Sequence, residues 1–385
     1  MAALSAEVGR SLVFTGRAEE AAPLIESALT IGEAIGRPEV ICEALTTKGL
    51  IYDFTNRPEE ARILTEGAIR IAERHGLGEQ LERPQLNIAE MYVLWDLPEA
   101  EAHLESALAA ARRVGDPTVE NAAGSGLILL NINACRWDVA ERLAGELLDP
   151  TRPARQGSDQ VNARIAILNA LRGDFATAHA NLDLLAPWEH AENAEYRGLF
   201  AATAGMIALT EGRFEQALER SGGIIREAVA MLGTGSEIVR QAWPDAIEAA
   251  LGLGRIDEAG DLLAVIGALP PGLVAPYLHA QGQRYRARVA AGRGEHDAVE
   301  ADFRGALERF AALRYPYRRA ETELDFARWL AERGRTEEAT ELAREAVATF
   351  MGLGALPALS AAREAVLLAG IDDALEVPED ELAAT

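Results

Sequence analysis

Histidine, lysine and serine often mark acid–base, phosphate-binding or nucleophilic sites, and in this sequence none of them has the required spacing. The six histidines include no His-Glu-x-x-His pair, the arrangement that places two zinc ligands on one helix face. Lys48 is the only lysine, so a phosphate-binding loop ending in Gly-Lys-Ser/Thr is excluded. No serine stands in a Gly-x-Ser-x-Gly turn. We therefore expect a protein that is not an enzyme, with no catalytic residues, metal site or cofactor.

The charge of the chain argues against a nucleic-acid ligand. The 385 residues carry a formal net charge of −24, and such an acidic surface repels phosphate backbones. No apolar run is long enough to span a bilayer, and the segment from Met1 to Ser11 lacks the pattern of a secretory signal. Cys42 and Cys135 are isolated, which predicts buried thiols in a reducing compartment. We therefore expect a cytoplasmic protein with no membrane partner and no direct nucleic-acid partner.

A six-residue motif that begins Gly-Arg or Asn-Arg and ends on alanine recurs along the chain. The clearest copies are residues 16–21, 56–61, 212–217, 254–259 and 334–339. When four weaker copies are counted as well, successive copies are 38 to 42 residues apart. The last position then falls on Ala21, Ala61, Ala100, Ala140, Ala178, Ala217, Ala259, Ala298 and Ala339. A period this regular indicates a repeat protein, which grows by stacking neighbours rather than around one large core.

Each copy predicts the turn between two antiparallel helices, here called A and B. Gly16 and its equivalents can adopt the left-handed conformation that ends helix A, and the acidic residues that follow favour the start of helix B. Seven positions after the alanine, five copies have a small residue that allows close helix packing. The four middle copies instead have Leu147, Leu185, Ile224 and Ile266. The sequence therefore predicts an all-α solenoid whose packing is irregular in the middle.

We expect a single solenoid over residues 1–385. A first block of four repeats covers 1–149, and a second block of five covers 158–370. The stretch from Asp149 to Gly157 separates them, either as an ordinary long loop or as a hinge between domains. Residues 371–385 have the composition of a frayed, acidic C-terminal tail.

Aromatic, histidine and arginine residues gather in the expected A helices of the second block. In helix-pair solenoids one helix of each pair lines the concave surface, and these residue types dominate binding hot spots. We therefore expect a groove that binds a protein segment or a small effector; the alternative is that these side chains fill spaces between helices of unequal length. Pro244 predicts a kink or a restart of its helix. The groove candidates are Trp188, His190, Tyr196, Arg240, Trp243, Tyr277, His279, Arg284, Tyr315 and Arg318, with Tyr285 and Tyr317 beside them.

The Gly-x-x-x-x-Ala turn with a small residue seven positions later resembles the tetratricopeptide repeat, in a variety longer than the usual length of roughly 34 residues. The most specific stretches are residues 241–255, 279–288, 303–310 and 332–339. The resemblance implies a right-handed superhelix of nine antiparallel helix pairs. This part of the chain looks like the repeat region of actinobacterial adenylate/guanylate cyclases that are fused to a signal-transduction ATPase. Similar arrays occur in LuxR-type regulators of the same ATPase class.

The resemblance covers the repeat region alone, so it implies a regulatory scaffold rather than cyclase or ATPase activity. Its partners would be a protein segment, a small effector, or the ATPase and cyclase domains of the same parent protein. The alternative is the effector-sensing region of a LuxR-type transcription regulator that controls DNA binding indirectly. The first expected helix carries apolar Leu4 and Val8 with no capping repeat before it, which predicts further domains upstream in the native gene.

Overall fold

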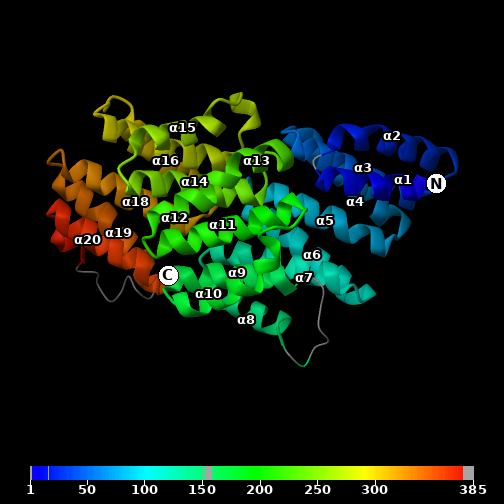
Figure 1. Ribbon diagram of the computed structural model, residues 1–385, viewed down its shortest axis with the longest axis horizontal. Coiled ribbons are helices and arrows are strands. Elements are labelled where there is room, and N and C mark those ends of the chain that lie inside the picture. The colour runs from blue at the N-terminus through cyan, green and yellow to red at the C-terminus, as the bar shows by residue number, and fades with distance from the viewer. Residues whose placement is uncertain (1, 16, 150, 152–157, 376–385) are drawn as a thin grey trace.

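The structure, a computed structural model, describes residues 2–15, 17–149, 151 and 158–375 (Figure 1). These residues form helices joined by short turns, and no β-strand occurs among them. Each A helix packs against the B helix that follows it, which confirms the all-α repeat architecture. The A helices are α1 (Ala2–Phe14), α3 (Pro38–Phe54), α5 (Gly78–Tyr92), α7 (Pro117–Asn133), α9 (Ser158–Arg172), α11 (Ala194–Thr210), α14 (Glu237–Gly252), α16 (Pro276–Arg293) and α18 (Pro316–Ala331).

The B helices are regular at both ends of the array and broken in its middle. The regular ones are α2 (Ala18–Ala34), α4 (Pro58–His75), α6 (Leu97–Val114), α8 (Trp137–Leu147), α10 (Phe175–Leu184), α15 (Ile256–Gly267), α17 (Val299–Leu313) and α19 (Thr336–Leu353). The sixth B helix consists of α12 (Phe214–Ala217), the π-helical turn η2 (Leu218–Gly222) and α13 (Gly223–Leu232). Short 3-10 turns η1 (Ala186–Trp188) and η3 (Pro271–Leu273) follow α10 and α15. The irregularity therefore falls in the middle copies, as their larger residues predict.

The turn from helix A to helix B has the left-handed backbone that the glycines predict. Gly173, Gly212, Gly254 and Gly334 have φ values from 71° to 85°. Asn56 and Cys135 occupy the same position with φ of 58° and 60°. The turn therefore keeps its left-handed backbone even where the residue is not glycine. Gly16 lies outside the described residues.

The arginine that follows this turn belongs to the architecture of the repeat. Arg255 and Arg335 occupy the N-cap position of their B helices, yet neither side chain caps the backbone. Arg335 Nη1 instead lies 2.7 Å from Glu300 Oε2 of the preceding repeat. Arg255 Nη2 likewise lies 2.8 Å from Glu215 Oε2, 40 residues earlier. These exposed ion pairs link neighbouring turns on the surface.

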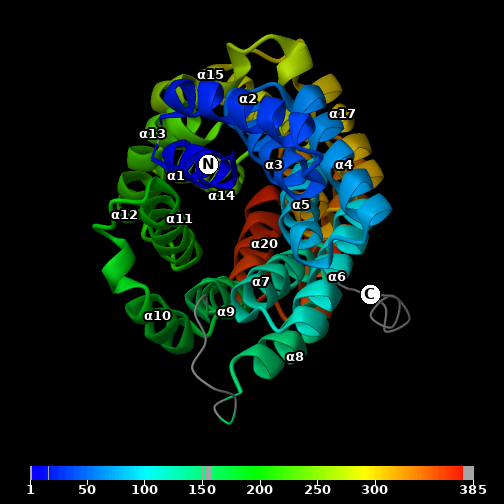
Figure 2. The ribbon, with the colours of Figure 1, turned by 90° about the vertical axis from the view of Figure 1, so that its right-hand side faces the viewer.

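The A helices lie on the inside of the array and the B helices on the outside. Figure 2 shows this arrangement along the length of the array, with α5, α7, α9 and α11 around an interior space and α6, α8 and α10 outside them. Some inner helices are buried on nearly every side, as α7 is from Val119 to Ile132. Such a helix is therefore enclosed by its own B helix and by both neighbouring repeats.

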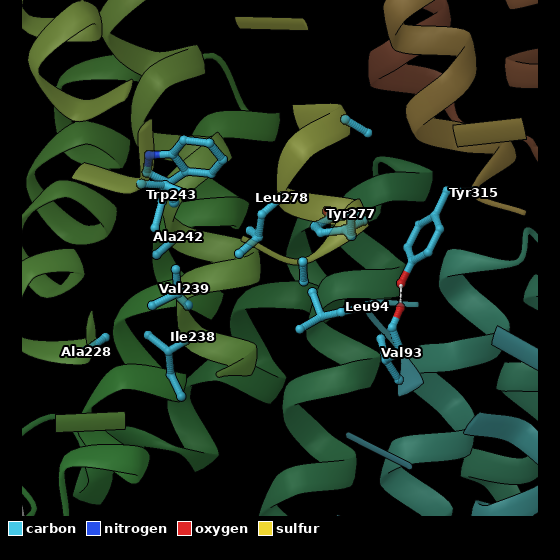
Figure 3. Packing of buried hydrophobic residues seen from close by; sticks show 14 of the residues in the cluster. Val93, Leu94, Ala228, Ile238, Val239, Ala242, Trp243, Tyr277, Leu278 and Tyr315 are labelled. Carbon is cyan, nitrogen blue, oxygen red and sulfur yellow. Dashed lines mark hydrogen bonds between the residues drawn. The ribbon is translucent and has the colours of Figure 1, made fainter. Parts of the chain in front are cut away.

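The two blocks share one hydrophobic core. A single cluster of buried residues runs from Ala89 in the first block to Tyr315 in the second. Tyr315 Oη donates a 2.7 Å hydrogen bond to the carbonyl oxygen of Val93, and the Tyr277 amide donates a 3.2 Å bond to the Leu94 carbonyl (Figure 3). The end of α5 thus meets the beginnings of α16 and α18. Most of the stretch at 149–157 lies outside the described residues, but the array on either side of it is packed together.

The C-terminal end of the array is folded further than the sequence indicates. Helix α20 (Leu356–Ala369) packs against α18, α19 and α9, and Figure 2 shows it inside the ring of helices. The turn η4 (Asp372–Leu375) packs on α19, and Ile371 and Ala374 are buried. The expected tail at 371–385 is therefore wrong for residues 371–375, because two apolar side chains cover the end of the core. Residues 376–385 lie outside the described part.

Candidate functional site

Three groove candidates form contacts between the two blocks instead of lining an open groove. Arg240, Tyr277 and Tyr315 are all buried near the N-terminal ends of their helices. Arg240 Nη2 lies 2.6 Å from Glu90 Oε2, and Arg240 Nη1 donates a 3.1 Å hydrogen bond to the Glu90 carbonyl oxygen. These contacts span 150 residues of sequence. Arg240 and Tyr315 therefore join α5 to the second block through their side chains, and Tyr277 does so through its backbone amide.

Arg284 is the centre of an ion-pair network across three A helices. Its Nε lies 2.7 Å from Asp325 Oδ2, its Nη1 lies 3.0 Å from Glu321 Oε2, and its Nη2 lies 3.3 Å from Glu248 Oε2. Arg288 also pairs with Glu248. Burial alone would raise the pKa of Glu248, but the charges of Arg288 and Arg284 outweigh it and lower the pKa to about 2. The Arg284 guanidinium is thus occupied by carboxylates of its own chain.

The cavity beside Arg318 is small. Arg318 Nη1 lies 3.0 Å from Glu321 Oε2, and the cavity it borders has a volume of about 40 Å³. That volume holds a few water molecules but no peptide side chain with its backbone. Its wall includes Arg240, Gln241, Tyr277, Tyr315, Tyr317 and Arg318. The structure therefore brings many of the predicted residues together, but around a cavity that is small.

Trp243 fills space between helices, which is the alternative that the sequence left open. It is 1% exposed, and its Nε1 donates a 2.8 Å hydrogen bond to the Leu262 carbonyl oxygen of α15. Helix α14 runs from Glu237 to Gly252 with Pro244 inside it. The predicted restart of this helix is therefore wrong, because the packing around Pro244 holds one continuous helix.

The remaining candidates lie elsewhere. Trp188 and Tyr196 stack on each other at the connection from α10 to α11, with ring centroids 4.6 Å apart and planes 10° apart. Tyr196 is 37% exposed, and His190 is exposed in the same connection. His279 lies apart from these residues, and its Nε2 lies 3.1 Å from the Pro271 carbonyl oxygen.

A larger hollow lies in the first block, where the sequence indicated no site. Its volume is about 750 Å³. The walls come from α1, α3, α5 and the junction of α6 with α7. We call it the first-block hollow. It is lined by Ala6, Glu7, Arg10, Phe14, Glu43, Thr46, Thr47, Leu50, Glu79, Gln80, Glu82, Arg83, Pro84, Leu86, Asn87, Val114, Gly115, Asp116, Pro117, Thr118, Val119 and Ala122.

Acidic side chains outnumber basic ones on this wall. The basic residues are Arg10 and Arg83. Burial lowers the pKa of Arg10, and the like charge of Arg83 lowers it further, so the two guanidinium groups oppose each other. The acidic residues are Glu7, Glu43, Glu79, Glu82 and Asp116. The first-block hollow therefore has a negative electrostatic potential, which attracts cations.

Glu82 is the least expected residue of the hollow. Its side chain is 3% exposed, and its Oε1 has no hydrogen-bond partner in the described structure. Burial raises the pKa of Glu82, and the charges of Asp116 and Glu79 raise it further. A buried carboxylate without a donor is costly, so such a group needs a specific reason.

No sequence signal singles out this site. Helix α5 buries Glu82 and Gln85, but other inner helices also bury charged side chains, such as Glu120 in α7 and Arg284 in α16. Gln85 Oε1 is bonded to His103 Nδ1, which accounts for its burial. The first-block hollow therefore becomes apparent only in the tertiary structure.

Within residues 2–15, 17–149, 151 and 158–375, no three His, Cys, Asp or Glu side chains converge as metal ligands. Burial raises the pKa of the Cys42 thiol to about 11, so this thiol stays protonated near neutral pH. In the same part of the chain, none of the helices combines the length and the apolar character needed to cross a bilayer.

The fold defines an all-α, solenoid-like array of antiparallel helix pairs, curved so that its two blocks meet. No family model and no curated protein matches the chain.

Proposed function

We propose that this protein is a non-enzymatic interaction scaffold and that its first-block hollow receives a polypeptide segment or a small effector. The observation that carries the proposal is the difference in size between two hollows. The first-block hollow has a volume of about 750 Å³, whereas the cavity that the groove candidates border, between the two blocks, has a volume of about 40 Å³. Ligand sites are concave and typically occupy roughly 300–1,000 Å³. The first-block hollow is therefore large enough for a ligand.

The wall of the hollow has the mixture of side chains that ligand sites use. Phe14, Leu50 and Leu86 supply apolar surface, and Asn87 and Thr118 supply neutral polar groups. Apolar area contributes affinity, while a few placed polar groups orient the ligand. The wall comes from regular helices, so its side chains are held in position before a ligand arrives, which lowers the entropic cost of binding.

The wider role that we propose is regulation in signal transduction, in the cytoplasm. Support comes from the resemblance of the turn motif to the repeat regions of cyclase–ATPase fusions. In such a protein the segment received by the hollow belongs to an ATPase or cyclase domain of the same parent protein or to a separate partner. Sequencing the gene on both sides of this region tests the parentage, and flanking reading frames without an ATPase or cyclase motif would contradict it.

A peptide-display selection on the purified chain tests the binding proposal. Thr118→Trp places an indole at an exposed position of the wall, and it should weaken the selected peptides at least tenfold. Glu105→Trp adds the same group to the outer helix α6 and should leave binding unchanged. A selection without enriched peptides, or peptides that bind Thr118→Trp as tightly as the original chain, would contradict the proposal.

A further inference from the structure

The buried carboxylate of Glu82 points to the chemistry of the occupant. Its side chain lies on the wall of the first-block hollow, and its Oε1 accepts no hydrogen bond from the described residues. Leaving a buried acceptor unpaired costs about 1–3 kcal/mol, and more for a charged group. A donor that enters the hollow removes this cost, so the site favours ligands that carry hydrogen-bond donors.

The surrounding charges select a cationic donor over a neutral one. Glu79 precedes Glu82 by one helical turn, and Asp116 begins the neighbouring helix α7. Glu43 lies on the facing helix α3. Charge-assisted hydrogen bonds from ammonium or guanidinium groups to carboxylates are roughly twice as strong as neutral ones. The wall therefore favours a positive group.

The spacing of the acids favours an extended organic cation over a metal ion. The carboxylates are distributed over α1, α3, α5 and the start of α7, and in the described part of the chain no three of them converge as metal ligands. Asn87 and Thr118 add neutral polar groups between the charges. Peptide groups both donate and accept hydrogen bonds, so a polypeptide backbone matches these neutral groups better than an aliphatic polyamine does.

We propose that the first-block hollow binds a basic polypeptide segment, with the Glu82 carboxylate accepting a hydrogen bond from an arginine or lysine side chain of that segment. This inference rests on the proposed function. It adds that the bound segment is positively charged and that Glu82 recognises it. Glu43 and Glu79 provide further negative charge along the same wall.

The test measures the fluorescence anisotropy of labelled (Arg-Ala)4, (Gln-Ala)4 and (Glu-Ala)4 peptides with the full chain, at an ionic strength of about 0.15 M, where long-range attraction is screened. We expect saturable binding of (Arg-Ala)4 alone. Glu82→Gln should weaken it at least tenfold, and Glu79→Gln should weaken it less. Glu105→Gln, which removes the same charge from exposed α6, should leave it unchanged. Thermal unfolding of Glu82→Gln should not fall, because the substitution removes a buried charge.

Each other outcome overturns a defined part of the inference. An equal loss of affinity for (Arg-Ala)4 in the Glu82→Gln and Glu105→Gln variants would show that net charge alone attracts the basic peptide. Spermine that binds more tightly than (Arg-Ala)4, and is sensitive to Glu82→Gln, would replace the peptide by a polyamine. If display-selected neutral peptides bind at the hollow and (Arg-Ala)4 does not, the proposed function stands and this inference fails. If neither kind of peptide binds, both fail.

Discussion

Tyr315 and Val93 are 222 residues apart, and the hydroxyl of one donates a 2.7 Å hydrogen bond to the backbone carbonyl of the other. The bond is buried, and it joins the end of α5 to the start of α18. It shows that the array curves until its first and second blocks touch. Figure 3 places it beside Leu94 and Tyr277, which make the parallel contact through the backbone. Tyr277 and Tyr315 at this joint also border the cavity of about 40 Å³.

Removal of this hydroxyl should loosen the joint between the blocks. We expect Tyr315→Phe to lower the free energy of unfolding by about 1–3 kcal/mol, because the buried Val93 carbonyl loses its donor. Urea unfolding followed by circular dichroism measures the change. Tyr196→Phe, at a partly exposed ring, is the control and should change stability little. Equal stabilities of the Tyr315→Phe and original chains would show that the joint does not need this bond.

The burial of Trp243 predicts that this residue contributes to the stability of the fold. Trp243→Ala should cost about 3–5 kcal/mol, because it leaves a large cavity between α14 and α15. Tyr196→Ala should cost less, about 0.5–1.5 kcal/mol, since its ring is 37% exposed and loses mainly the stacking on Trp188. Thermal unfolding of both variants compares them directly. A Trp243→Ala variant with unaltered stability would place this side chain on an accessible surface.

Two glycines with open space around them should change the stability of the fold in opposite directions when they are replaced by alanine. A Cβ at Gly254 meets nothing within 4 Å, but this residue has a φ of 71°, where an alanine costs about 1–2 kcal/mol. Gly67 also has open space around it and lies inside helix α4, where alanine gains about 1 kcal/mol. Denaturant midpoints of Gly254→Ala and Gly67→Ala measure both effects. Changes of the same sign would contradict the turn geometry.

Asp245 should make the stability of the fold depend on pH. It is 2% exposed, and its Oδ2 has no hydrogen-bond partner among the described residues. Burial raises its pKa to about 7, against the opposing charge of Arg318 and with the repulsion of Glu321 and Glu248. The folded state therefore keeps a proton that the unfolded chain releases near pH 4. This stabilisation is complete below about pH 4 and is lost as the pH rises through about 7.

Asp245→Asn should flatten that dependence, because the amide resembles the protonated acid and cannot ionise. Between about pH 5.5 and about pH 8, we expect the variant to lose about 1–3 kcal/mol less stability than the original chain. Urea unfolding at the two pH values measures it, with Asp257→Asn at an exposed position as the control. Some dependence should remain, since burial also raises the pKa values of Asp53 and Glu195 to about 7. An identical pH profile in Asp245→Asn would contradict the assignment.

The candidate site illustrates what a chain pattern can and cannot predict. Arginine and aromatic residues in the second-block A helices indicated a binding surface, and most of them do face the interior. Residue types alone do not reveal that Arg284 meets Asp325, 41 positions later, or that Tyr315 meets Val93. Glu82 could not be predicted for the same reason, because only the tertiary structure shows that its carboxylate lacks a hydrogen-bond donor.

The sequence by itself determined the helix pairs, their order and their turns, because these depend on interactions within a few residues of each other. A glycine such as Gly254 ends one helix, and the acids after it begin the next, whatever the rest of the chain does. The tertiary structure alone decided how strongly the array curves. Small differences in packing between repeats add up along the chain, and their sum is settled by contacts such as Tyr315 with Val93. That sum sets the size of the small cavity between the blocks and of the much larger first-block hollow.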